Sequence, residues 1–221
     1  MDHKIIDIAK EWLSESYDVI TQNEVQSLIY KGGEELIESF YKDLDFGTGG
    51  MRGIMGVGPN RINKYTIGKA TQGLANTLIE MYPGEKIAVA IAYDCRNKSG
   101  FFAQTAAEVL SANGITVHLF EALRPTPELS FAVRELHCKS GIVITASHNP
   151  KEYNGYKVYG NDGCQIVSPF DVQLINKVRS LSINEVNFKA NKALILPLGE
   201  EIDELYVNRL KTLSLSPKSI I

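Results

Sequence analysis

The sequence has no apolar run that approaches the roughly 20 residues needed to span a bilayer, and its first residues lack the apolar core of a secretory signal. It has only three cysteines, Cys95, Cys138 and Cys164, which are widely spaced and form no C-x-x-C pair. Free thiols of this kind fit a reducing compartment. The sequence therefore predicts a cytoplasmic protein without a membrane partner.

A surplus of basic residues is also missing. The chain has 26 Asp and Glu residues against 23 Lys and Arg residues, which gives a net charge of −3 and a pI near 5.9. Proteins that bind nucleic acids or anionic membranes by charge need a basic surface, so neither is an expected partner. A local basic pocket remains compatible with these totals. The length of 221 residues allows one good core, or one domain and part of another.

Several familiar site motifs are absent as well. The chain has no G-x-x-x-x-G-K-[ST] loop, no G-x-G-x-x-G and no G-x-S-x-G. None of the four histidines is paired with another histidine or with a cysteine at the spacing of zinc ligands. A compact D-x-D-x-D run, which would supply oxygen ligands to a metal, is missing too. These absences disfavour a P-loop nucleotide site, a hydrolase elbow and a zinc site.

The spacing of apolar residues predicts a helical arm followed by alternating strands and helices. Residues 3–42 are expected to form three short helices. Buried strands are expected at 86–93, 115–120 and 141–145, because these runs are almost continuously apolar. Helices are expected between the strands. This β-α-β-α-β core predicts an α/β fold in which a mostly parallel β-sheet lies between helices, with right-handed crossovers.

Local signals add finer expectations along the chain. Ser99 is expected to cap the helix that ends near Gly114, and Ser168 to Asp171 resemble a capping box for a helix ending near Leu181. Asn161-Asp162-Gly163 predicts a hairpin after the core. Residues 182–197 are expected to connect to a last helix. The glycine-rich segment 45–63 could be a bulged hairpin or a backbone that approaches a ligand around Arg52.

The stretch "TASHNP", residues 145–150, follows the third strand of the core. In parallel sheets ligands bind beyond the carboxyl ends of the strands, which places Ser147 at the expected site. Asn-Pro is also an ordinary turn signal, so a turn without chemistry is the alternative. Adjacent Ser147 and His148 rarely align as nucleophile and base, which disfavours a serine hydrolase. A phosphoserine at Ser147, held by cations such as Arg52, His148 and Lys157, fits better.

Three motifs in this order resemble the alpha-D-phosphohexomutase family, the phosphoglucomutases and phosphomannomutases. They are "FGTGGMRG" at 46–53, "TASHNP" at 145–150 and "NGYKVY" at 154–159. The helical arm and "GTGGMRGIMGVGPNRIN" are similar to the branch that includes phosphopentomutase-like members. The resemblance covers essentially the whole chain. It implies an arm at 1–44, the family's domain I at 45–197 and the truncated start of domain II at 198–221.

The resemblance also implies roles for individual residues. Ser147 matches the phosphorylated serine, whose phosphate supplies one ligand to Mg²⁺. His148 matches the neighbour that positions the phosphoryl group or the sugar, and Lys157 matches the lysine that assists proton transfer. Arg52 matches the loop arginine near phosphoserine and substrate. "YDCRNKS" resembles the family's D-x-R-x-x-S, in which Arg96 would steady the site and bind substrate.

The implied reaction interconverts a sugar 1-phosphate and a sugar 6-phosphate, of glucose or mannose, through a sugar bisphosphate. It implies a glucose 1,6-bisphosphate-type activator, phosphosugar substrates and Mg²⁺ whose protein ligands lie in a missing domain II. The remaining domains of the same chain would be partners, and an isolated fragment would have little turnover. The alternatives are a phosphopentomutase of the same family and a non-catalytic domain that binds sugar phosphates.

Overall fold

The computed structural model describes residues 3–47 and 50–215, and its centre is a seven-stranded sheet. The strand order is β1-β2-β6-β5-β3-β4-β7. The strands are β1 (Phe46–Gly47), β2 (Gly50–Ile54), β3 (Ala88–Tyr93), β4 (Thr116–Phe120), β5 (Ser140–Ile144), β6 (Tyr153–Gly160) and β7 (Ile195–Leu198). The helices are α1 (His3–Glu11), α2 (Val19–Lys31), α3 (Glu34–Phe40), α4 (Lys64–Met81), α5 (Ser99–Ala112), α6 (Thr126–Glu135), α7 (Phe170–Ser180) and α8 (Glu200–Leu213), with 3-10 turns at η1 (Ile183–Glu185) and η2 (Lys192–Leu194).

The sheet is mostly parallel, as the sequence predicts. Strands β5, β3, β4 and β7 are parallel neighbours. Strand β6 runs antiparallel to β5, and β2 runs antiparallel to β6, so β2 points the same way as the parallel four. Five of the seven strands therefore share one direction, which is four parallel strands plus β2. The expected β-α-β-α-β core is β3-α5-β4-α6-β5.

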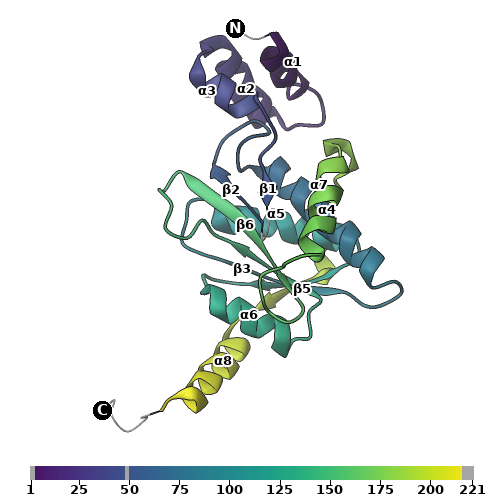
Figure 1. The fold of residues 1–221 in the computed structure, drawn as a ribbon, viewed down its shortest axis with the longest axis vertical. Helices are drawn as coiled ribbons and strands as arrows, with labels where there is room; N and C mark the ends of the chain where they lie inside the picture. The colour runs from purple at the N-terminus through teal and green to yellow at the C-terminus, as the bar shows by residue number, and fades with distance from the viewer. Residues whose placement is uncertain (1–2, 48–49, 216–221) are drawn as a thin grey trace.

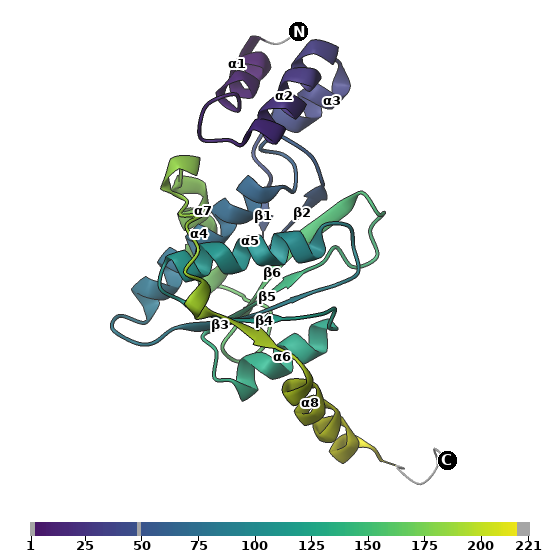
Figure 2. The ribbon, with the colours of Figure 1, turned by 180° about the vertical axis from the view of Figure 1, so that it is seen from behind.

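Helices cover both faces of the sheet. Helices α4, α5 and α7 lie on one face, and α6 lies on the other with α8 packed against it (Figures 1 and 2). The larger apolar core is on the α4, α5 and α7 face, and a smaller core lies under α6. Strand β3 is buried on both faces because its run AVAIAY contributes Val89 and Ile91 to one core and Ala90 and Ala92 to the other.

Helices α1, α2 and α3 form the expected arm, which lies at the top of Figure 1. Their apolar faces make a third, separate core. Trp12 stacks on Tyr17 with ring centroids 4.5 Å apart, and the edge of Tyr65 from α4 contacts both rings. The arm therefore has its own packing and is joined to the sheet domain by an aromatic contact.

Two predicted helix caps are wrong. Lys98, in the left-handed conformation with φ at 61°, precedes α5, and Ser99 is the first helical residue. The Ser99 hydroxyl donates to Asp94 Oδ1 at 3.0 Å instead of capping the helix. At α7 no side-chain cap forms, because the N–H groups of Phe170 and Asp171 donate to the carbonyl of Val167. In both cases a tertiary or backbone partner replaces the local cap.

Two expectations about strands need correction. The turn at Asn161-Asp162-Gly163 exists, but the returning limb makes only an isolated bridge between Tyr159 and Gln165. Strand β2 occupies residues 153–157 on that side of β6, so the returning limb meets only residues 158–160. The predicted connector 182–197 contains most of β7, which pairs with the outer edge of β4. None of the described helices is long and apolar enough to cross a membrane.

Candidate functional site

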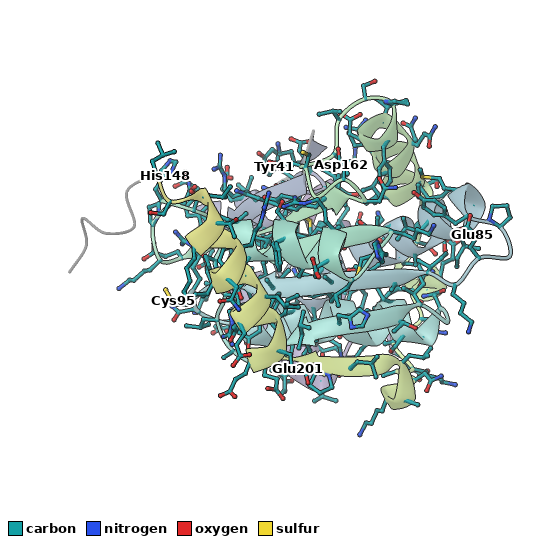
Figure 3. The ribbon with its side chains drawn as sticks, turned by 90° about the horizontal axis from the view of Figure 1, so that it is seen from below. Tyr41, Glu85, Cys95, His148, Asp162 and Glu201 are labelled. Carbon is teal, nitrogen blue, oxygen red and sulfur yellow. The ribbon has the colours of Figure 1, made fainter. Side chains whose placement is uncertain are left out.

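Ser147 lies beyond the carboxyl end of β5, in the loop that leads to β6. Ser147 and His148 are both exposed. Figure 3 shows His148 and Cys95 at one end of the sheet and Glu85 at the opposite end. Because Glu85 precedes β3 and Cys95 follows it, the end that carries His148 is the carboxyl end of the parallel strands. This is the edge at which sheets of this class bind ligands.

Ser147 adopts the left-handed backbone conformation, with φ at 54°. For a residue other than glycine this conformation costs about 1–2 kcal/mol, so the surrounding contacts must hold it. The backbone N–H of Ser147 donates to Oγ1 of Thr145 at 3.0 Å. The Thr145 hydroxyl in turn donates to Oδ2 of Asp94 at 2.6 Å. A strained serine at the end of a strand is thus tied to the loop that follows β3.

Arg96 binds the backbone of the same loop from the other side. Its Nη2 donates to the carbonyls of Ser147 and Asn149 at 2.5 and 2.6 Å. Its Nη1 donates to the carbonyls of Pro150 and Tyr153 at 2.9 and 3.1 Å. The guanidinium therefore holds four peptide carbonyls in place. Its predicted contact with substrate stays a prediction, whereas its steadying of the loop is visible in the geometry.

Asn154 makes a third link between the two loops. Its side chain is fully buried, and Nδ2 donates to the Asn97 carbonyl at 3.1 Å and to Ser99 Oγ at 3.0 Å. Its Oδ1 accepts from the N–H of Gly155 at 2.8 Å. The loops after β3 and β5 are consequently bonded to each other and to the start of β6.

Arg52 and Lys157 lie on neighbouring strands. In the register of β2 and β6, Arg52 is opposite Gly155 and Lys157 is two residues farther along β6, opposite Gly50. Alternation along a strand puts Gly155 and Lys157 on one face of the sheet, so Arg52 and Lys157 are diagonal neighbours there. Within residues 3–47 and 50–215 neither cation forms an ion pair or hydrogen bond. Both are available to a bound anion.

Arg52, Lys157 and His148 differ in how far they lie from Ser147 along the strand direction. Thr145 donates its N–H to the Gly155 carbonyl, so Arg52, opposite Gly155 on β2, is level with Thr145, and β6 lies between them. Lys157 is opposite Val143, which is farther back along β5. His148 is adjacent in sequence, and its Nδ1 lies 3.4 Å from Oγ of Ser147. The structure brings Arg52 and His148 towards one end of the sheet and leaves Lys157 deeper along it.

A complete metal site is not formed by the described part of the chain. No group of three or more His, Cys, Asp or Glu side chains there could hold a metal ion. Asp94, the carboxylate near Ser147, already accepts hydrogen bonds from Arg96, Ser99 and Thr145. The described residues therefore do not fit an all-protein Mg²⁺ site.

Sequence reasoning did not assign roles to Asp94, Thr145 and Asn154. The signal for Asp94 was present, because it opens the D-x-R-x-x-S stretch whose Arg96 was a candidate. Thr145 and Asn154 are the first residues of two of the recognised motifs, but their partners lie 51 to 57 residues away in sequence, at Asp94, Asn97 and Ser99. Only the register of β3 beside β5 reveals these contacts.

Comparisons with known proteins agree on a single family. The family model described as "Phosphoglucomutase/phosphomannomutase, alpha/beta/alpha domain I" matches residues 43–184. A phosphoglucomutase from Staphylococcus haemolyticus (strain JCSC1435) is 40% identical over 181 residues, which are 80% of this chain and 33% of that protein. A phosphoglucomutase from Staphylococcus aureus (strain USA300) is 40% identical over 208 residues, 91% of this chain and 36% of that protein.

Solved structures have the same fold. A protein from Thermus thermophilus, provisionally named a phosphomannomutase, superposes with a TM-score of 0.63 at 27% identity and covers 78% of this chain and 36% of its own. Parafusin, a phosphoglucomutase from Paramecium, superposes with a TM-score of 0.60 at 18% identity, over 79% of this chain and 36% of its own, and supports the fold alone. The chain spans about a third of the length of the curated relatives that it matches.

Proposed function

The chain belongs to the phosphoglucomutase/phosphomannomutase family, and on that premise we propose that it is the phosphoserine-bearing, amino-terminal part of a phosphosugar mutase. The whole enzyme would be an isomerase that interconverts the 1-phosphate and 6-phosphate of glucose or mannose. The observation that carries this proposal is the exposed, backbone-anchored Ser147 at the carboxyl end of β5, with Arg52 near the same end of the sheet on β2, its side chain unpaired among the described residues.

Each residue has a step in the proposed reaction. A hydroxyl oxygen of the sugar monophosphate bonds to the phosphorus of phospho-Ser147 while the bond from phosphorus to Ser147 Oγ breaks. The sugar hydroxyl releases a proton, and His148 or Lys157 would take it up and later return it. Arg52 would face the charge of the transferring group, since arginine forms bidentate contacts with phosphate. After the bisphosphate turns over, its other phosphoryl group moves to Ser147.

Mg²⁺ is the implied cofactor, and when bound it would neutralise charge on the phosphoryl oxygens. This chain would contribute one ligand, an oxygen of phosphorylated Ser147. We place the remaining ligands, the sugar-reading residues and most of the turnover in the rest of a longer protein. The proposed division is an arm at 1–44, domain I at 45–197 and the start of domain II at 198–221. We also propose a cytoplasmic location and a sugar bisphosphate activator.

A non-catalytic domain that binds sugar phosphates is the second candidate. The observation in its favour is the lack of a complete metal site among the described residues. Such a domain would bind a sugar monophosphate through Arg52 and Lys157 without forming phosphoserine. Formation of phosphoserine therefore discriminates between the two functions.

The test is the Ser147→Ala substitution in the longer parent protein, with conversion of glucose 1-phosphate to glucose 6-phosphate as the assay. Removal of a covalent nucleophile is expected to lower turnover by on the order of 10⁴-fold or more. Ser168→Ala is the matched control, since Ser168 is also exposed but precedes α7. Turnover by Ser147→Ala near that of the unaltered protein would refute the proposal.

A further inference from the structure

One carboxylate, that of Asp94, is at the centre of the contacts that fix the Ser147 loop. Its Oδ2 accepts the Thr145 hydroxyl at 2.6 Å. Its Oδ1 accepts the N–H of Arg96 and the hydroxyl of Ser99, both at 3.0 Å. Asp94 is itself held at the end of β3, where its N–H donates to the Ile144 carbonyl of β5 at 3.2 Å.

We propose that Asp94 is a positioning residue that keeps Ser147 in its left-handed conformation by two routes, one through Thr145 and one through Arg96. This inference rests on the proposed function, because it is about the orientation in which Ser147 gives and receives a phosphoryl group. Asp94 does not contact Ser147. It acts on the two peptide groups that flank the Ser147 side chain.

The first route sets the direction of a hydroxyl. Thr145 has one O–H proton and two lone pairs. A carboxylate only accepts hydrogen bonds, so the Thr145 proton points to Asp94 and the lone pairs are left for the N–H of Ser147. An ionised acceptor also makes this bond short and strong. With an amide in place of the carboxylate, this polarity is no longer enforced.

The second route sets the position of the Arg96 guanidinium. Asp94 accepts the backbone N–H of Arg96, and its Oδ2 lies 3.6 Å from Nε of the same residue. Thus oriented, Nη2 of Arg96 donates to the carbonyl of Ser147 at 2.5 Å. The N–H and the C=O of Ser147 are therefore each held by a residue that Asp94 orients. Together they fix the direction of the bond from Cα to Cβ, and with it the place of Oγ.

Phosphoryl transfer needs the attacking and leaving oxygens to be in line. A misplacement of about 1 Å in a reacting group can lower a rate by on the order of 10²-fold. A residue that only orients Oγ should therefore change the rate of transfer more than the binding of the sugar phosphate. A slower transfer at unchanged substrate binding therefore distinguishes a positioning residue from a substrate-binding residue.

The test uses Thr145→Val and Asp94→Asn, which keep the size of each side chain, in the longer parent protein, and measures phosphate transfer from glucose 1,6-bisphosphate to Ser147 by intact-protein mass. We expect transfer to slow by about 10²-fold in both variants, with little change in the bisphosphate concentration that gives half the maximal rate. Thr145→Ser restores the hydroxyl and should recover the rate. Thr77→Val is the matched control, since it removes a buried threonine hydroxyl from α4.

A second readout does not depend on catalysis. In the unaltered protein the amide proton of Ser147 should be protected from hydrogen exchange by its bond to Thr145, and this protection should be lost in Thr145→Val and Asp94→Asn but kept in Thr145→Ser. Unchanged protection and unchanged transfer in both variants would overturn the positioning role. If the unaltered protein takes up no phosphate, the proposed function fails, while the exchange pattern still supports or refutes the role of Asp94.

Discussion

At the scale of single residues, the packing around the Ser147 loop depends on Gly155, which has no side chain. A Cβ atom added to Gly155 would lie 2.6 Å from the carbonyl oxygen of Thr145 and 2.8 Å from that of Met51. Both atoms are backbone and cannot move aside independently of β5 and β2. Gly155 therefore lets the strand that carries Arg52 and the strand that leads to Ser147 come close to β6 on either side.

We expect Gly155→Ala to destabilise the fold by about 1–3 kcal/mol, because the strands must separate to admit the methyl group. Urea unfolding followed by circular dichroism measures this loss. Gly100→Ala is the matched control, since its Cβ would be 3.5 Å from the Tyr93 ring, an ordinary contact, and alanine favours the helix. Equal stabilities of the two variants would contradict the close approach at Gly155.

At the scale of elements, α6 and α8 are linked by a cluster of charges around Arg124. Arg124 donates from Nε and Nη2 to the two carboxylate oxygens of Asp203 on α8, at 2.7 and 2.5 Å. Glu128 on α6 is 4% exposed, and its Oε1 lies 3.8 Å from Arg124 Nε without a hydrogen-bond partner. Burial first, and then the hydrogen bond and charge of Asp203, raise the pKa of Glu128 to about 7.

The contribution of Glu128 to stability therefore depends on pH. The folded protein holds the Glu128 proton more tightly than the unfolded chain, in which the pKa is about 4.5, so this contribution is complete below pH 4.5 and is lost as the pH rises through about 7. The hydrogen bonds from Arg124 are the main cause that lowers the pKa of Asp203, and that carboxylate loses its contribution as the pH falls through its lowered value. The cluster therefore stabilises the fold most at pH values between the lowered pKa of Asp203 and the raised pKa of Glu128, which is about 7.

We expect the free energy of unfolding to fall by on the order of 1–3 kcal/mol between pH 5 and pH 8 because of Glu128. Glu128→Gln, which resembles the protonated acid, should flatten this part of the profile. The measurement is urea unfolding at a series of pH values, and Glu108→Gln on α5 is a control in which the slope should persist. A slope that is the same in Glu128→Gln and in the unaltered protein would show that Glu128 does not titrate in this range.

The elements also show what sequence patterns can predict. Strand β3 and helix α5 follow from long apolar patterns that tertiary contacts only reinforce. Strand β7 was missed because it has four residues, includes Pro197 and exists through pairing with β4, whose paired residues lie 78 positions earlier. The caps expected at Ser99 and Ser168 failed for a related reason, since Asp94 and the Val167 carbonyl take the available hydrogen bonds.

At the scale of the whole molecule, the position of Ser147 follows from the fold class, because a loop after a central parallel strand must lie at the carboxyl edge of the sheet. Its chemistry was suggested by the recognised motifs. The anchoring of the loop could not be predicted, because it depends on Asp94 and Thr145 being brought together by the pairing of β3 with β5. Residue types suggested phosphoserine chemistry at Ser147, whereas strand register determines which residues hold the Ser147 loop.

The arrangement of the molecule also explains why the rest of a longer protein is needed in our account. Ser147 and Arg52 lie at an exposed edge, and the described residues enclose no metal site there. A phosphoserine at an open edge would be accessible to water, so a mutase needs further structure to close over it. The chain's span of about a third of its relatives is consistent with this division of labour.

The most direct test is to incubate the longer parent protein with glucose 1,6-bisphosphate and Mg²⁺, digest it and locate any added phosphate by tandem mass spectrometry. Our account predicts a single major phosphopeptide with the phosphate on Ser147, and none from that site in Ser147→Ala. A protein that binds the bisphosphate but carries no phosphate on Ser147, or carries it on another residue, would contradict the central claim that this serine is the phosphoryl carrier.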